Sequence, residues 1–333
     1  MKSNLLSLLL VFIYFTVSAQ YSNTSHEEAV DVKKKTLLIA LDEQDIAMVN
    51  KLKKEPEKLK AYQDFIAGKN EAMKNAVQKI WTFSKYEFKP AKEATRLVTS
   101  KKTAYMLLKF SSIGDYTYTR SSQGINSAPS GYSYNKNMGG YSYNAPAGEM
   151  KKTGDVPILS LASTKEILKV NLPTAYPSEG EMMFALGHLQ YILAYLAENE
   201  KHGIMNLIKK QLDVNVKFLK DKTLLVDTED LKKGVTEDEI KAAYGFPVKA
   251  VSSEEIDKAL INKTFGYAVI KIIPVEIGGG GVKAHVIADT ENSLFYYFDY
   301  VKNTNISGIS VGKKVEFLQE KDFKNIAKAI TDK

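Results

Sequence analysis

The chain has 333 residues, 46 Lys and Arg against 39 Asp and Glu, and no cysteine. A chain without cysteine contains neither disulfide bonds nor thiolate metal sites, which suits a bacterial envelope better than a eukaryotic secretory route. The formal net charge of +7 comes from lysines interleaved with acidic residues along the whole sequence. Because this charge is dispersed and does not gather on one segment, we expect no nucleic-acid partner.

The first 19 residues are typical of a secretory signal peptide. Lys2 supplies a positive charge, residues 5–17 form a short apolar run, and Val17-Ser18-Ala19 provides the small residues of a cleavage site. We therefore expect cleavage before Gln20, a mature chain of 314 residues (333 − 19 = 314), and no stable membrane span afterwards. The expected location is the periplasm of a Gram-negative-type cell, with the cell surface or release into the medium as alternatives.

One sequence pattern occurs twice. Residues 35–39, KTLLI, return as residues 222–226, KTLLV. Each copy is followed by acidic residues, a helical pattern, a short strand, a second helix and a second apolar strand, at 104–110 and 266–272. A fixed order of similar elements is the signature of a duplicated unit. We therefore predict an α/β (α+β) fold with two duplicated β-α-β-α-β-β-β units joined by a helical segment.

The first unit is expected over residues 33–177, after a polar and flexible lead-in at 20–32. Apolar residues at three- and four-residue spacings predict helices between Gln44 and Phe83, with a new start at Pro56 and a break at Gly68. The remaining predicted elements are strands at 36–41, 86–90 and 104–110, a helix at 93–100, and two closing strands within 131–144 and 157–161.

Connecting helices are expected over residues 178–215 and the second unit over 216–333. The helix from Glu179 is apolar nearly all round, which predicts that it is buried between the units or in a dimer. Ser252 followed by acidic residues predicts a helix start. The other predicted elements of the second unit are strands at 223–226, 248–251, 267–277, 282–287, 294–300 and 315–318, and helices at 237–244 and 323–330.

A tyrosine-rich insertion is expected over residues 111–150. Gly131-Tyr132-Ser133-Tyr134-Asn135 is repeated as Gly140-Tyr141-Ser142-Tyr143-Asn144. Alternating tyrosines in an extended chain share one face and offer rigid, amphipathic contact area for sugars, peptides or a protein surface. The alternative is a low-complexity hairpin without a binding role. The candidate binding residues are Tyr116, Tyr118, Tyr132, Tyr134, Tyr141 and Tyr143.

A possible polar site comprises Asp42, Asp227 and His285. The two aspartates follow the first strand of each unit, and ligands of α/β sheets gather beyond the carboxyl ends of strands. The alternative is that both carboxylates cap helices. His285 lies on an alternating strand near acidic residues, but no HxxxH or HExxH pattern is present, so we predict no metal site.

No motif predicts a catalytic residue or a cofactor. The four glycines at 278–281 lie between two strands, whereas a phosphate-binding loop leads into a helix, so they indicate a hairpin turn. The chain also lacks the G-x-S-x-G pattern of a nucleophile elbow.

The order of elements resembles the small α/β units of envelope proteins, such as the TolB amino-terminal domain and the CsgG/LpoB-type domains. The resemblance rests on residues 222–226, on 267–272 and on the hairpin from His285 to Tyr300. It implies scaffolding or partner binding in the envelope, and it assigns no functional residue.

The resulting expectation is an exported, non-enzymatic binding or scaffolding protein that contacts an envelope protein or a glycan through the tyrosine-rich insertion. Two alternatives remain open. One is an oligomeric component that assembles through the central helix, and the other is an enzyme that uses carboxylates at strand ends.

Overall fold

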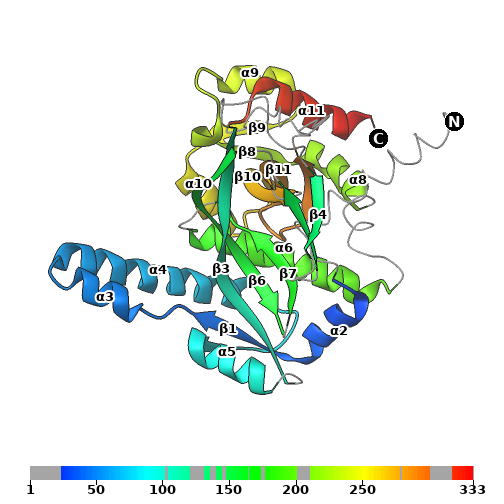
Figure 1. The fold of residues 1–333 in the computed structure, drawn as a ribbon. Helices are drawn as coiled ribbons and strands as arrows, with labels where there is room; N and C mark the ends of the chain where they lie inside the picture. The colour runs from blue at the N-terminus through cyan, green and yellow to red at the C-terminus, as the bar shows by residue number, and fades with distance from the viewer. Residues whose placement is uncertain are drawn as a thin grey trace.

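A computed structural model describes most of the chain, and Figure 1 shows its ribbon. The described residues are 24–101, 104–120, 131–135, 140–144, 148–163, 165–173, 177–200, 211–277, 280–300 and 317–332. The predicted signal peptide lies outside them. The fold is mixed α/β, as expected, with two five-stranded sheets and a separate two-stranded sheet.

The first unit is a five-stranded sheet with the strand order β2-β1-β3-β6-β7. Strands β1, β2 and β3 are parallel to one another, whereas β6 is antiparallel to β3 and β7 is antiparallel to β6. The elements are α2 (His26–Lys34), β1 (Thr36–Leu41), α3 (Ile46–Leu52), α4 (Pro56–Ile80), β2 (Tyr86–Pro90), α5 (Ala91–Ser100), β3 (Tyr105–Arg120), β6 (Gly148–Ala162), β7 (Glu166–Asn171) and α6 (Glu179–Glu198).

The second unit has the same topology, with the strand order β9-β8-β10-β11-β12 and the same parallel and antiparallel pairings. Its elements are α8 (Leu212–Asn215), η2 (Val216–Asp221), β8 (Thr223–Asp227), η3 (Thr228–Asp230), α9 (Glu237–Tyr244), β9 (Val248–Val251), α10 (Ser253–Ile261), β10 (Tyr267–Ile277), β11 (Gly280–Asp289), β12 (Phe295–Tyr300) and α11 (Glu320–Thr331).

The duplication extends to the pairing register. Thr36 lies opposite Tyr105 in the first sheet, and Thr223 lies opposite Tyr267 in the second. The register with the other neighbouring strand is also the same, since Leu37 of β1 pairs with Tyr86 of β2 and Leu224 of β8 pairs with Val248 of β9. The two KTLL segments are therefore equivalent central strands, and the predicted repeat is confirmed.

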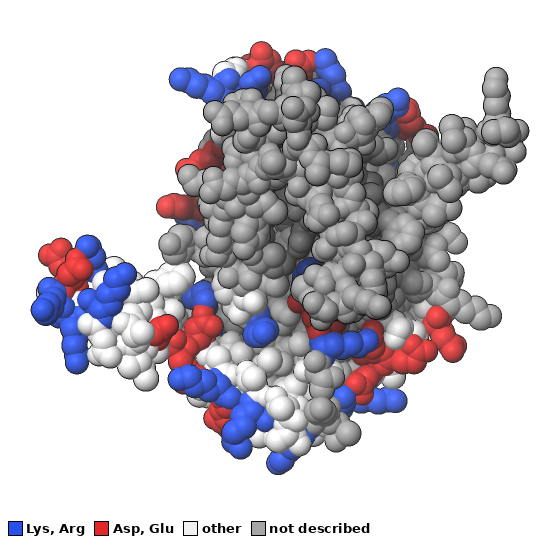
Figure 2. All heavy atoms as spheres, in the orientation of Figure 1, with Lys and Arg blue, Asp and Glu red and all other residues white. Residues whose placement is uncertain are grey.

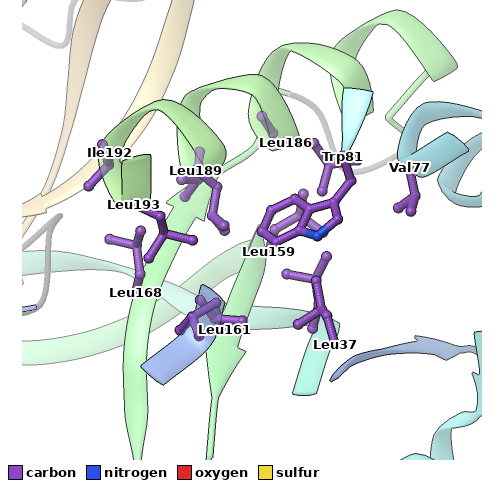
Figure 3. Packing of buried hydrophobic residues seen from close by; sticks show 14 of the residues in the cluster. Leu37, Val77, Trp81, Leu159, Leu161, Leu168, Leu186, Leu189, Ile192 and Leu193 are labelled. Atoms are coloured by element: carbon purple, nitrogen blue, oxygen red, sulfur yellow. The ribbon is translucent and has the colours of Figure 1, made fainter. Parts of the chain in front are cut away.

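Helices cover both faces of each sheet. In the first unit, α2, α4 and α6 pack on one face and α5 on the other. Figure 3 shows leucines of α6 above Leu159, Leu161 and Leu168 of the sheet, with Trp81 beside them. In the second unit, α9, α11 and η2 cover one face, whereas α10 and Phe184 of α6 cover the other.

Helix α6 therefore lies between the two units, as its apolar sequence predicts. It packs on α2 and α4 of the first unit and on α10 of the second. It is also the first unit's equivalent of α11, because each follows the last strand of its sheet and each packs on the helix between the first two strands. The segment that joins the units is thus part of the first unit's own helical layer.

Several predictions for the first unit are wrong. The lead-in is ordered from Thr24 onward, since Ser25 caps α2 through a capping box with Glu28 and α2 buries Ala29 and Val32. Helix α4 continues through Gly68, because an exposed glycine costs a long helix only about 1 kcal/mol.

One of the two closing strands of the first sheet was predicted correctly, since residues 157–161 lie in β6, and the other was predicted at the wrong place. The closing strands are β6 and β7, whereas residues 131–144 contribute β4 (Gly131–Asn135) and β5 (Gly140–Asn144) to the separate two-stranded sheet. In the second unit, Leu318 of the predicted strand 315–318 forms a bridge with Leu231, and residues 301–316 lie outside the described part.

Candidate functional site

The two copies of the GYSYN segment pair with each other. Strands β4 and β5 are antiparallel, and their register places Tyr132 opposite Tyr143 and Tyr134 opposite Tyr141. Positions two residues apart in a strand belong to the same face, so the four tyrosine positions are in phase across the two strands. The pair belongs to neither five-stranded sheet.

The structure separates the other two candidate tyrosines from this pair. Tyr116 and Tyr118 lie in β3, opposite Lys152 and Met150 of β6, in the distal half of a long hairpin that continues the first sheet. The six candidate positions thus divide into four on the β4–β5 sheet and two on the β3–β6 hairpin.

Asp42 lies just beyond β1 and is engaged locally. Its carboxylate pairs with Lys69 of α4, and its backbone N–H and carbonyl exchange hydrogen bonds of 2.8 and 2.9 Å with the side chain of Asn70. The Lys69 ammonium also lies 3.8 Å from the ring centroid of Phe110, a cation–π contact. These contacts fasten α4 to the end of β1.

Asp227 is the last residue of β8 and is buried. One carboxylate oxygen accepts a hydrogen bond of 3.0 Å from the backbone of Glu229, and the other accepts one of 2.6 Å from the hydroxyl of Ser253 at the start of α10. A carboxylate with both oxygens engaged at a turn and a helix start has a structural role here. For this aspartate the geometry matches the capping alternative.

His285 is buried on the face of the second sheet that is opposite to α10. It lies directly across from Asp299 of β12, and among the described residues its Nε2 atom has no hydrogen-bond partner. Burial lowers the pKa of His285, although the nearby carboxylates of Asp322 and Asp299 act in the opposite direction. The hydroxyl of Tyr297 donates a hydrogen bond of 3.2 Å to Asp299.

The three predicted polar residues do not form one site. Asp42 belongs to the first unit, and Asp227 bonds to α10, which covers the face of the second sheet opposite to His285. Within the part of the chain that the structure describes, no three His, Asp or Glu side chains are grouped closely enough to hold a metal ion.

A set of polar contacts that the sequence analysis did not identify joins α6 to the second unit. Asp257 of α10 accepts hydrogen bonds from the Ser178 hydroxyl and, at 2.8 Å, from the Gly180 backbone, and so caps α6 from the other unit. Buried Glu181 forms an ion pair of 3.6 Å with buried Lys271 of β10. These contacts cross the boundary between the units.

Close approach of α6 depends on two glycines spaced seven residues apart. A Cβ atom at Gly180 would lie 3.0 Å from the backbone oxygen of Asp257, and one at Gly187 would overlap the side chain of Ser293. Next to Gly187, the ring of His188 lies 3.6 Å from that of Phe295, centroid to centroid. In the sequence, these contacts with the second unit were indicated only by Gly180, Gly187 and His188 within a mostly apolar helix.

The buried position of His188 has an electrostatic consequence. Burial disfavours the imidazolium form and lowers the pKa of His188 to about 3. His188 is therefore neutral at physiological pH, and the helix that joins the units carries no charge at this point.

Comparisons with known proteins identify no relative, because no family model, no curated protein and no solved structure matches the chain. The resemblance to TolB-type and CsgG/LpoB-type domains therefore stays a prediction. Among the described residues, no helix is both long and apolar enough to cross a bilayer.

Proposed function

We propose that the chain is an exported, non-enzymatic binding or scaffolding protein of a Gram-negative-type cell envelope. In this proposal the tyrosine-rich β4–β5 sheet contacts an envelope protein or a glycan. The observation that supports it is the pairing of the two GYSYN segments, which aligns four tyrosine positions on a sheet separate from the two main ones. Aromatic and hydroxyl groups of tyrosine suit such contacts because little conformational entropy is lost when they bind.

The rest of the fold suits a scaffold. The two units are joined through a buried helix, an interdomain cap and a buried ion pair, so they would hold an attached contact surface in a constant relation to the body. The candidate carboxylates of the strand ends are engaged in capping and ion pairing, and α6 is covered by its own chain. No comparable observation favours the enzymatic or oligomeric alternative.

The register of β3 and β6 suggests a clean deletion. Arg120 and Gly148 are directly opposite each other at the end of the described ladder, so an Asn-Gly turn can replace residues 121–147 without disturbing the hairpin. The matched point variant replaces Tyr132, Tyr134, Tyr141 and Tyr143 by Ser, and its control replaces the same four residues by Phe.

The assay has two stages. Proteins and glycans captured from solubilised envelopes by the mature chain are identified, and each purified candidate is then titrated against wild type and variants. We expect the deletion and the serine variant to weaken binding at least tenfold, whereas the phenylalanine control keeps part of the affinity. Equal binding by wild type and deletion would refute a contact through this sheet.

A further inference from the structure

The first unit contains a helical arm that the second unit lacks. The arm comprises residues 43–69, that is, α3 and the first half of α4. In the second unit, the corresponding connection from β8 is η3 and a short loop leading into the eight-residue α9. The second unit forms the same sheet without such an arm, so the sheet topology does not require it.

The arm contributes nothing to the core. None of residues 41–72 is buried, whereas the second half of α4 buries Met73, Ala76 and Val77 against the sheet. Helix α4 has 25 residues and is therefore about 37 Å long, and its first half extends away from both sheets (Figure 1).

Polar contacts nevertheless give the arm a defined shape. The Tyr62 hydroxyl accepts a hydrogen bond of 2.8 Å from the Asp45 backbone, and Asp45 caps α3. The side chain of Gln63 bonds to Gln44 at 3.2 Å. A seven-residue helix is unstable alone, so α3 is held in place by α4.

The outer surface of the arm combines apolar and basic side chains. Ile46 is 70% exposed and Met48 39% exposed, and both belong to α3, which has no buried residue. Exposed Lys51, Lys53 and Lys54 follow at the free end, and no ion pair is recorded for them among the described residues. Figure 2 shows basic side chains at this end, with acidic ones among them, and an uncharged stretch toward the body.

The charge of the arm is positive at its end. The arm, residues 43–69, contains six lysines and five acidic residues, which gives 6 − 5 = +1, and three of the lysines follow one another closely at its end. Two of the acidic residues are occupied, because Glu55 pairs with Lys58 and Asp64 pairs with Lys60. Lys51, Lys53 and Lys54, at the turn between α3 and α4, therefore form an exposed basic group at the end of the arm, and Ile46 lies at the other end of α3.

We propose that this arm docks on the surface of an anionic phospholipid bilayer. Lysines near such a surface are attracted to its negative potential, and exposed apolar side chains of the same arm can enter the boundary between headgroups and acyl chains. Because the arm projects from the body, its end can reach a planar surface while the sheets stay clear of it. The contact is peripheral and reversible, and it does not involve the tyrosine-rich insertion.

The test measures binding of the mature chain, from Gln20 onward, to vesicles. One set of vesicles contains phosphatidylglycerol and phosphatidylcholine in equal parts, and the other contains phosphatidylcholine alone. Binding is followed by co-sedimentation at 0.05 M and 1 M salt, because surface electrostatics acts over about 3 Å at 1 M salt.

Three variants locate the contact. The first replaces Lys51, Lys53 and Lys54 by Glu, and the second replaces Ile46 and Met48 by Ser. The control replaces Lys217, Lys232 and Lys233, exposed lysines of the second unit, by Glu, which changes the net charge by the same amount. Unfolding midpoints of all variants are compared with wild type, so that a loss of binding is not mistaken for a loss of folding.

We expect binding to anionic vesicles that disappears at 1 M salt and is absent from phosphatidylcholine. The loss of each lysine near the surface lowers the affinity about fivefold, and the three glutamates add repulsion, so the first variant should bind at least about a hundredfold more weakly, with the control near wild type. The proposal is overturned if wild type does not bind anionic vesicles, or if arm and control variants lose binding equally. It is also overturned if Ile46→Glu converts a dimer into a monomer, because a second copy would then cover the arm.

Discussion

Acidification should destabilise the folded chain through His188, and the size of the effect follows from the burial of this residue. The pKa of His188 is about 3 in the folded chain, against 6.5 for an ordinary histidine. Between these values the unfolded chain binds the proton and the folded chain does not, so stability falls as the pH falls. The loss is of the order of 1 kcal/mol per pH unit below 6.5, or about 3 kcal/mol at pH 4.5.

The assay compares wild type with His188→Leu, which removes the titrating group and keeps an apolar side chain beside Phe295. Urea unfolding at pH 7 and pH 4.5 can be followed by the fluorescence of Trp81, the single tryptophan, which is buried in the cluster that α6 covers. Carboxylates protonate in both proteins, so their contribution cancels in the difference. We expect the urea midpoint of wild type to fall further on acidification, and equal shifts in the two proteins would refute the reasoning.

Three further predictions concern stability, each checked by the urea midpoint. Gly187→Ala should destabilise the chain by about 1–3 kcal/mol, because its Cβ would overlap Ser293. Gly68→Ala is the matched comparison and should stabilise it by about 0.5–1 kcal/mol, because the added Cβ meets open space in a helix. Asp289→Ala should cost about 3–5 kcal/mol, since it leaves the Lys222 ammonium, now 2.7 Å from Asp289, without its carboxylate. The reasoning is contradicted for the residue concerned if Gly187→Ala stabilises the chain, if Gly68→Ala destabilises it, or if Asp289→Ala leaves its stability unchanged.

The sequence predicted best those elements that local chemistry determines. Helix α9 and strands β9 and β10 have the predicted bounds, and Ser252 caps α10 as expected, because apolar period and capping residues agree there. The equivalence of the two KTLL strands was predictable for the same reason, since the order of elements around them is repeated.

The errors occur where long-range contacts decide the outcome. Helix α2 has only two buried residues, and its stability depends on packing against α6, which is 150 residues away in sequence. The apolar half of β6 was predicted at 157–161, but the short strand β7 was missed, and the more regular GYSYN alternation was assigned to the first sheet instead. The Asp257 cap of α6 has no local signal, because donor and acceptor belong to different units.

The duplication makes each unit a reference for the other. Counting from the equivalent strands β3 and β10, Leu159 and its partner Val170 occupy the places that His285 and Asp299 occupy in the second unit. The fold accepts an apolar pair there, so the pair of buried His285 and half-buried Asp299 is not a requirement of the topology.

The same reasoning applies to the helical arm and to the tyrosine-rich insertion, which only the first unit has. A segment that one unit omits while keeping its strand order and register is not needed for folding of the shared core. Burial supports this for the arm, where none of residues 41–72 is buried. Selection for binding can change such a segment without loss of stability, because the core does not depend on it. Both proposed contact surfaces lie in segments of this kind.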